Sequence, residues 1–98
     1  MRTVLIAAAF ALAPHAALAD DVAARSMAAT CAGCHGTAGH SVTKAVEPLA
    51  GRPKERIVEL MQAFKTGKKP ATVMQQISKG YTDEQIEMIA GYLAAQEK

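Results

Sequence analysis

The chain has 98 residues, with 11 Lys and Arg against 9 Asp and Glu, and a formal net charge of +2. This near balance gives no reason to expect binding to nucleic acid or to an anionic membrane. Only 4% of the residues are aromatic and Trp is absent, so a chain of this size lacks the large side chains that would fill a core.

Residues 1–19 predict a secretory signal peptide. A positively charged start precedes an apolar run from Val4 to Leu12, and an Ala-Leu-Ala sequence ends at residue 19. Because the run is too short to cross a membrane, we expect cleavage before Asp20, a periplasmic protein and no membrane span after cleavage. An uncleaved N-terminal anchor is the alternative. Residues 20–98 then form one small domain.

This domain is predicted to be all-α, because apolar residues recur at helical spacing and no alternating apolar-polar run indicates a strand. Gly and Pro residues mark the loops between four helical segments. The stretch between the first two segments, with three glycines, predicts irregular backbone. The segments run from Asp20 to about Thr30, from Pro53 to a stop at Gly67, from Pro70 to Gly80, and from Thr82 onward.

The last segment has the clearest start signal in the chain. Thr82 and Gln85 have the spacing of a capping box, and Tyr81 can pack on Ile86 as a hydrophobic staple. Gly91 lies in the interior of this helix, where it weakens the helix unless another helix passes close by.

Cys31, Cys34 and His35 form the Cys-x-x-Cys-His pattern of c-type haem attachment. Each thiol can add across one vinyl group of the same haem, and the adjacent histidine is then held against the iron. A haem is a large apolar disc, so its burial would also supply the core that the side chains lack. The motif therefore predicts one covalently bound haem c.

Three other uses of the cysteine pair fit less well. A disulfide would leave the core unfilled and give His35 no role. A thioredoxin-like redox pair requires a domain with strands, which the sequence does not predict. Structural zinc requires four ligands, and His40 lies too close in sequence to complete such a site.

The second axial ligand of the iron is a separate question. Met61 and Met88 lie in apolar helical segments, which is typical of core residues. Met27 precedes the motif by one turn of helix, and His40 follows His35 too closely to reach the opposite face of the haem. Met74 lies close to Pro70 in the sequence, where the chain can return across that face of the haem. Spacing therefore favours Met74 as the second axial ligand, and the alternative is that Met74 is one more core methionine. The candidates in the expected domain are Met27, Met61, Met74, Met88 and His40.

A thioether ligand raises the reduction potential, which suits an electron carrier. With both axial positions filled by the protein, no site remains for a substrate. We therefore expect an electron-transfer protein that is not an enzyme by itself.

The sequence resembles the class I cytochromes c, and within them the single-haem cytochrome subunit of flavocytochrome c sulfide dehydrogenase. The broad resemblance rests on the haem motif, on Pro-Leu-Ala-Gly at residues 48–51 and on a downstream methionine. The narrower resemblance rests on ELMQAFKTG at residues 59–67 and on ATVMQQISKGYTDEQI at residues 71–86.

This resemblance implies a small cytochrome c fold of about four short helices around one covalently attached haem. It implies Met74 as the distal iron ligand, and Pro48 as the residue whose backbone carbonyl accepts a hydrogen bond from the other ring nitrogen of His35. It also implies that the first and last helices cross closely, which a small residue such as Gly91 would permit.

The implied partner is a flavoprotein subunit that oxidises sulfide and passes electrons to the haem. Many cytochrome subunits of this enzyme carry two haem domains, whereas this chain has one attachment motif. Two alternatives stay open. One is a freely diffusing cytochrome that serves other periplasmic redox enzymes, and the other is a haem sensor or peroxidase-like enzyme with an open axial site.

Overall fold

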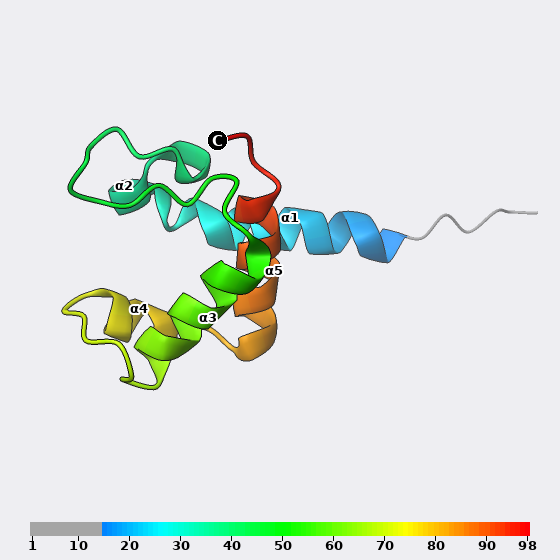
Figure 1. Ribbon diagram of the computed structural model, residues 1–98. Helices are drawn as coiled ribbons and strands as arrows, with labels where there is room; N and C mark the ends of the chain where they lie inside the picture. Colours follow the sequence, from blue (N-terminus) through cyan, green and yellow to red (C-terminus); the bar gives the residue numbers. More distant parts are fainter. Residues whose placement is uncertain (1–14) are drawn as a thin grey trace, which may run out of the picture.

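A computed structural model describes residues 15–98, and in this range the chain forms five α-helices and one 3₁₀ helix (Figure 1). No strand occurs among these residues, which confirms the all-α prediction. The elements are α1 (His15–Ala29), α2 (Ala32–His35), η1 (Thr37–Gly39), α3 (Lys54–Lys65), α4 (Met74–Lys79) and α5 (Asp83–Ala94).

The core forms around α5. Helix α1 crosses α5 on one side, and α3 packs against both α5 and α4 (Figure 1). The side chains of Ile86, Ile89 and Leu93 are at most 1% exposed, so the apolar stripe of this helix is the centre of the core. The whole buried cluster comprises Ala28, Ile57, Met61, Ile86, Ile89, Ala90 and Leu93.

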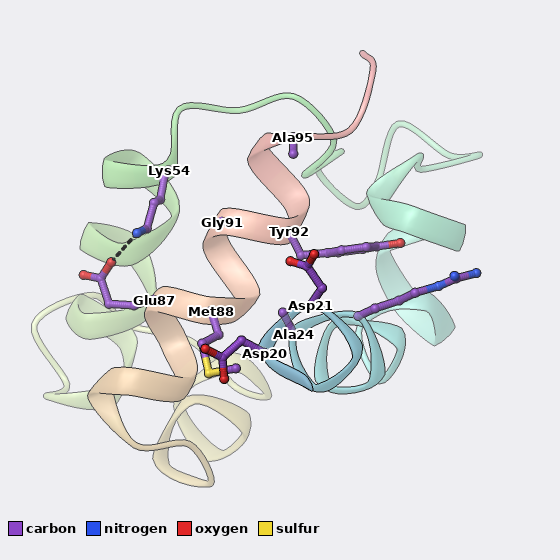
Figure 2. Close-up of a pocket in the computed structure, with 10 residues that line it drawn as sticks. Asp20, Asp21, Ala24, Lys54, Glu87, Met88, Gly91, Tyr92 and Ala95 are labelled. Atoms are coloured by element: carbon purple, nitrogen blue, oxygen red, sulfur yellow. Dashed lines mark ion pairs between the residues drawn. The ribbon is translucent and has the colours of Figure 1, made fainter. Parts of the chain in front are cut away.

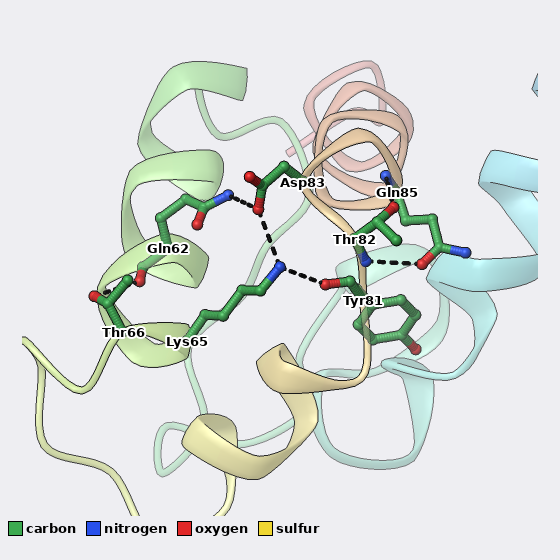
Figure 3. Close-up of polar contacts among 7 residues, drawn as sticks. All are labelled: Gln62, Lys65, Thr66, Tyr81, Thr82, Asp83 and Gln85. Carbon is green, nitrogen blue, oxygen red and sulfur yellow. Dashed lines mark hydrogen bonds and ion pairs between the residues drawn. The ribbon is translucent and has the colours of Figure 1, made fainter.

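The predicted capping box begins α5. The Thr82 hydroxyl accepts a hydrogen bond from the Gln85 backbone N–H at 3.1 Å, and the Thr82 N–H donates to the Gln85 side-chain carbonyl at 2.9 Å (Figure 3). These bonds satisfy backbone donors that a helix otherwise leaves without partners. Tyr81, just before the cap, packs against the core cluster that contains Ile86.

Removal of this cap should destabilise the fold. We expect Thr82→Ala to lower the free energy of unfolding of the holoprotein by about 1 kcal/mol, because the helix loses its N-terminal side-chain acceptor. Thr43→Ala is the matched control, since the Thr43 side chain is exposed in a loop. Urea denaturation measures both variants. An equal midpoint shift in the two variants would show that the capping box contributes nothing.

A polar network joins α3 to the start of α5 (Figure 3). The Lys65 ammonium donates to the Tyr81 carbonyl at 2.7 Å and to the Asp83 carboxylate at 3.0 Å. Gln62 donates to the same carboxylate at 2.9 Å. Hydrogen bonds from Gln62 and Lys65, with the Lys65 charge, lower the pKa of Asp83, so the network weakens as the pH falls through that lowered pKa.

Two helix starts differ from the predictions. Helix α1 is already formed at His15, the first described residue, and passes through the predicted cleavage point at Asp20, because its alanine-rich sequence favours continuous helix. Helix α4 begins at Met74 and not at Pro70, since β-branched Thr72 and Val73 disfavour helix. The signal peptide at residues 1–19 stays a prediction, because its first fourteen residues lie outside the described range. No helix in the described range is long and apolar enough to span a membrane.

The role predicted for Gly91 is wrong. Helices α1 and α5 do cross, but a Cβ atom added at Gly91 would meet no atom within 4 Å. Ala28 of α1 and Ala90 of α5 are instead the small residues of these two helices that belong to the buried core cluster. Gly91 instead lines an open groove beside the crossing (Figure 2). The sequence shows that small residues are present, but only the helix rotation decides which of them lies in the contact.

Candidate haem site

The attachment motif lies on a single helical turn. Cys31 precedes α2, and the His35 backbone N–H donates to the Cys31 carbonyl at 2.9 Å. The backbone from Cys31 to His35 is therefore helical, where the glycine pattern predicted irregular structure. This turn brings both free thiols to one side of the chain, with His35 directly after them.

The two thiols have different surroundings. Cys31 is half-buried and packs against the core, whereas Cys34 is exposed. Burial raises the pKa of the Cys31 thiol, and the neighbouring Cys34 adds to the rise. Both sulfur atoms remain available for attachment because neither is in a disulfide.

Glycines turn the chain directly after His35. Gly36 has a φ of 85° and Gly39 has a φ of 81°. Residues other than glycine rarely adopt this left-handed backbone region. A Cβ atom on Gly36 would run into the carbonyl oxygen of His40. The Gly39 carbonyl then accepts hydrogen bonds from the N–H groups of Leu49 at 2.8 Å and Ala50 at 3.1 Å. These bonds hold the returning segment beside the attachment turn.

That segment orients the His35 ring. The Nδ1 atom of His35 donates to the backbone carbonyl of Glu47 at 2.7 Å. A carbonyl can only accept a hydrogen bond, so the proton lies on Nδ1 and the lone pair of Nε2 is left for a metal. Such a bond fixes both the ring orientation and the tautomer of a metal-binding histidine.

The acceptor is therefore Glu47 and not Pro48, to which the resemblance assigned this role. The proline restricts the residue before it to extended backbone, where adjacent carbonyls point in different directions. Only the path of the returning segment decides which carbonyl faces the ring. An ion pair of 3.0 Å joins the Glu47 carboxylate to Arg52 and lowers the pKa of that carboxyl. Sequence reasoning missed Glu47, although its place before the proline was a usable signal.

His40 is engaged elsewhere. Its Nδ1 atom lies 3.2 Å from the Thr37 carbonyl, and its Nε2 atom lies 2.6 Å from the Glu97 carbonyl. Both ring nitrogens thus face backbone carbonyls, and His40 ties the C-terminal end of the chain to the turn after the motif. This arrangement removes His40 from the candidates for the second axial ligand.

The methionines fall into different environments. Met61 is buried in the core, as predicted, and Met27 packs against the same cluster. Met88 was expected in the core but lines the groove between α1 and α5, which is a hollow of about 530 Å³ (Figure 2). Met74 is half-buried at the start of α4. The groove is separate from the haem motif, because none of its lining residues belongs to that motif.

Apolar side chains are exposed around Met74. The neighbouring Val73 is 56% exposed, and Ile77 on the next turn is 39% exposed. Helices α2 and α4 project to the same side of the molecule from the crossing of α1 and α5 (Figure 1). A haem held between these two helices would cover this apolar surface, so the two thiols, the Nε2 atom of His35 and the Met74 sulfur form a donor set that fits the group.

A further contact links the two parts of the site. The Thr30 hydroxyl and the Tyr81 hydroxyl share a hydrogen bond of 2.7 Å. Thr30 precedes the attachment motif, and Tyr81 follows α4, so this bond ties together the two segments that carry the candidate ligands. Sequence reasoning missed this pair, and no local pattern could have revealed it because the residues are far apart in the chain.

The chain matches the family model described as "Cytochrome C oxidase, cbb3-type, subunit III" over residues 19–93. It belongs to this family of c-type cytochromes. This finding confirms the resemblance to class I cytochromes c and their fold. The cofactor of this cytochrome is accordingly a covalently bound haem c, and Cys31 and Cys34 fit its attachment motif.

Three similar proteins are also cytochromes, in agreement with this family assignment. The cytochrome subunit of sulfide dehydrogenase from Chlorobaculum tepidum is 43% identical over 64% of this chain and 56% of its own length. Cytochrome c4 from Pseudomonas aeruginosa is 32% identical over 85% of this chain and 41% of its own length. Cytochrome c-554(548) from Halomonas halodenitrificans is 30% identical over 80% of this chain and 98% of its own length. This cytochrome thus spans about half the length of the first two relatives.

Proposed function

We propose that this cytochrome is a one-electron carrier in which Cys31 and Cys34 hold the haem covalently and His35 and Met74 bind the iron. The observation that carries the proposal is the hydrogen bond from His35 Nδ1 to the Glu47 carbonyl, which leaves Nε2 for the iron. The exposed apolar surface around Met74 supports the placement of the haem between α2 and α4.

Two protein ligands on the iron favour electron transfer over catalysis. A histidine and a thioether together leave no open position for substrate or oxygen, and the thioether favours ferrous iron. This arrangement argues against the haem sensor and the peroxidase-like enzyme. The chain is then a carrier that is not an enzyme by itself.

The partner that we propose is a flavoprotein subunit of a sulfide dehydrogenase. The 43% identity to the cytochrome subunit of that enzyme supports this choice. Sulfide would be oxidised on the flavoprotein, and each electron would reduce one ferric haem to the ferrous state. We also propose that residues 1–19 direct export and are removed before Asp20, which places the carrier in the periplasm.

A freely diffusing carrier for other periplasmic redox enzymes is the second candidate. The match to 98% of the length of the Halomonas cytochrome favours it, because that protein is no longer than this single unit. The two candidates differ in how the partner is held. The part of the apolar surface at Val73 that the haem leaves uncovered would offer an apolar docking centre, whereas exposed Lys68, Lys69 and Lys79 offer charge.

The ionic-strength dependence of haem reduction separates the two candidates. If apolar packing holds a stable subunit, reduction by sulfide in the presence of the flavoprotein should be fast and change less than about twofold between low and moderate salt. Stopped-flow absorbance of the haem measures the rate. A steep fall with salt would favour the diffusing carrier, and no reduction by any flavoprotein would exclude the sulfide assignment.

Two variants make this measurement sharper. Val73→Thr keeps the shape of the side chain but replaces one methyl group by a hydroxyl. It should therefore slow the reduction of the haem if the docking centre is apolar. Lys68→Met removes one charge and should then have little effect. The opposite order of the two effects would show that charge guides the encounter.

A further inference from the structure

Ser78 carries an unexplained polar group. Its side chain is 0% exposed, and its hydroxyl is the one buried side-chain polar atom in the described residues that has no hydrogen-bond partner. Buried hydroxyls are nearly always paired, because an unpaired one loses its bonds to water and gains none in return. The hydroxyl therefore needs a partner that its surroundings do not supply in this arrangement of the side chains.

The position of Ser78 on α4 indicates what this partner is. Ser78 follows Met74 by four residues, so the two side chains lie on one face of the helix. Helical side chains lean toward the N-terminus, which directs the Ser78 side chain toward the turn that begins at Met74. At 3.6 residues per turn, the direction of the Met74 side chain around the axis of α4 falls between those of Ile77, which is exposed, and Ser78, which is buried.

We infer that the Ser78 hydroxyl donates a hydrogen bond to the thioether sulfur of Met74 when that sulfur binds the haem iron. The inference rests on the axial ligation proposed above. Thioether sulfur is a weak acceptor in water, but the bond gains strength where the donor is withdrawn from solvent. Ser78 is in this way a positioning residue that acts on the iron through Met74.

This bond has two consequences that go together. It draws electron density from the sulfur, so the sulfur becomes a weaker donor to ferric iron. The reduction potential is thereby raised, and the bond between Met74 and ferric iron becomes easier to displace.

A purely structural role predicts different behaviour. If the Ser78 hydroxyl only turned to bond the Met74 backbone carbonyl, as serines in helices can, its removal would leave the potential unchanged. If the side chain mattered only for its volume, removal would loosen α4 and make the Met74 sulfur easier to displace.

The experiment compares Ser78→Ala, which removes the hydroxyl, with Ser78→Thr, which keeps it, in the holoprotein. Ser26→Ala is the control, because Ser26 is exposed on α1. Spectroelectrochemistry measures the potential, titration of the ferric form with cyanide measures displacement of the sulfur, and the far-red absorption band of sulfur-ligated haem reports ligation.

We expect Ser78→Ala to keep the far-red band, to lower the potential, and to lower the affinity for cyanide by about twofold to tenfold, the factor that one net hydrogen bond is worth. Ser78→Thr should retain the potential of the parent protein. An unchanged potential in Ser78→Ala, a higher affinity for cyanide, or an equal fall of potential in both variants would overturn the inference. Absence of the far-red band in the parent protein would instead overturn the ligation by Met74.

Discussion

Met74→Ala should abolish the far-red charge-transfer band of the ferric protein and open the iron to cyanide and carbon monoxide. The reduction potential should fall by at least about 0.1 V, because axial ligands set haem potentials over a range of about 0.8 V and a thioether favours ferrous iron. Absorption spectra with and without added ligand, together with a redox titration, measure all three effects. The haem itself should stay attached, since both cysteines are retained.

Two conservative changes test whether this effect belongs to Met74 alone. Met61→Leu changes a buried core residue, and Met88→Leu changes a residue of the groove between α1 and α5. Both variants should keep the far-red band and the parental potential, because swaps of Met for Leu conserve volume. Loss of the band in Met61→Leu, with Met74→Ala unchanged, would reassign the axial ligand.

Replacement of the attachment cysteines should have the other large effect. Haem in the parent protein should survive denaturing electrophoresis and acid-acetone extraction, because two thioether bonds hold it. Cys34→Ser should lower the yield of holoprotein and leave a single bond through Cys31. The variant with both cysteines replaced should release all its haem, and we expect little folded protein, because the remaining core is small.

Peroxidase staining of gels and haem extraction measure these outcomes. Thr37→Ala is the control, since Thr37 is an exposed residue in the turn next to the motif and should leave attachment unchanged. Complete extraction of haem from the parent protein by acid-acetone would contradict covalent attachment. Unchanged attachment in Cys34→Ser would contradict the assignment of that thiol.

Features that depend on neighbours in the sequence were predictable. The capping box needs only Thr82 and Gln85, three residues apart, and both of its hydrogen bonds form. The apolar stripe of α5 needs only helical periodicity, and its residues Ile86, Ile89 and Leu93 are at most 1% exposed. The attachment motif needs only the order of Cys31, Cys34 and His35, although its backbone is a helical turn where the glycines predicted irregular structure.

Features that depend on the path of the chain were predicted less well. One error was local: α4 starts at Met74 and not at Pro70, because β-branched residues between them disfavour helix. Met88 faces a groove and not the core, since the rotation of α5 sets its direction. The bond between Thr30 and Tyr81 joins two segments with no shared pattern.

The sequence by itself determined that this protein is all-α, that its family is that of the c-type cytochromes, and that haem is its cofactor, because each follows from periodicity or from a short motif. Only the tertiary structure decided that Glu47, and not Pro48, holds the His35 ring, and that Gly91 does not lie in the contact between α1 and α5. Tertiary structure also left Ser78 buried one turn after Met74, with no hydrogen-bond partner among the residues that the structure describes. The reason is physical: a carbonyl, a Cβ atom or a hydroxyl acts through its direction in space, and distant segments set that direction when they pack.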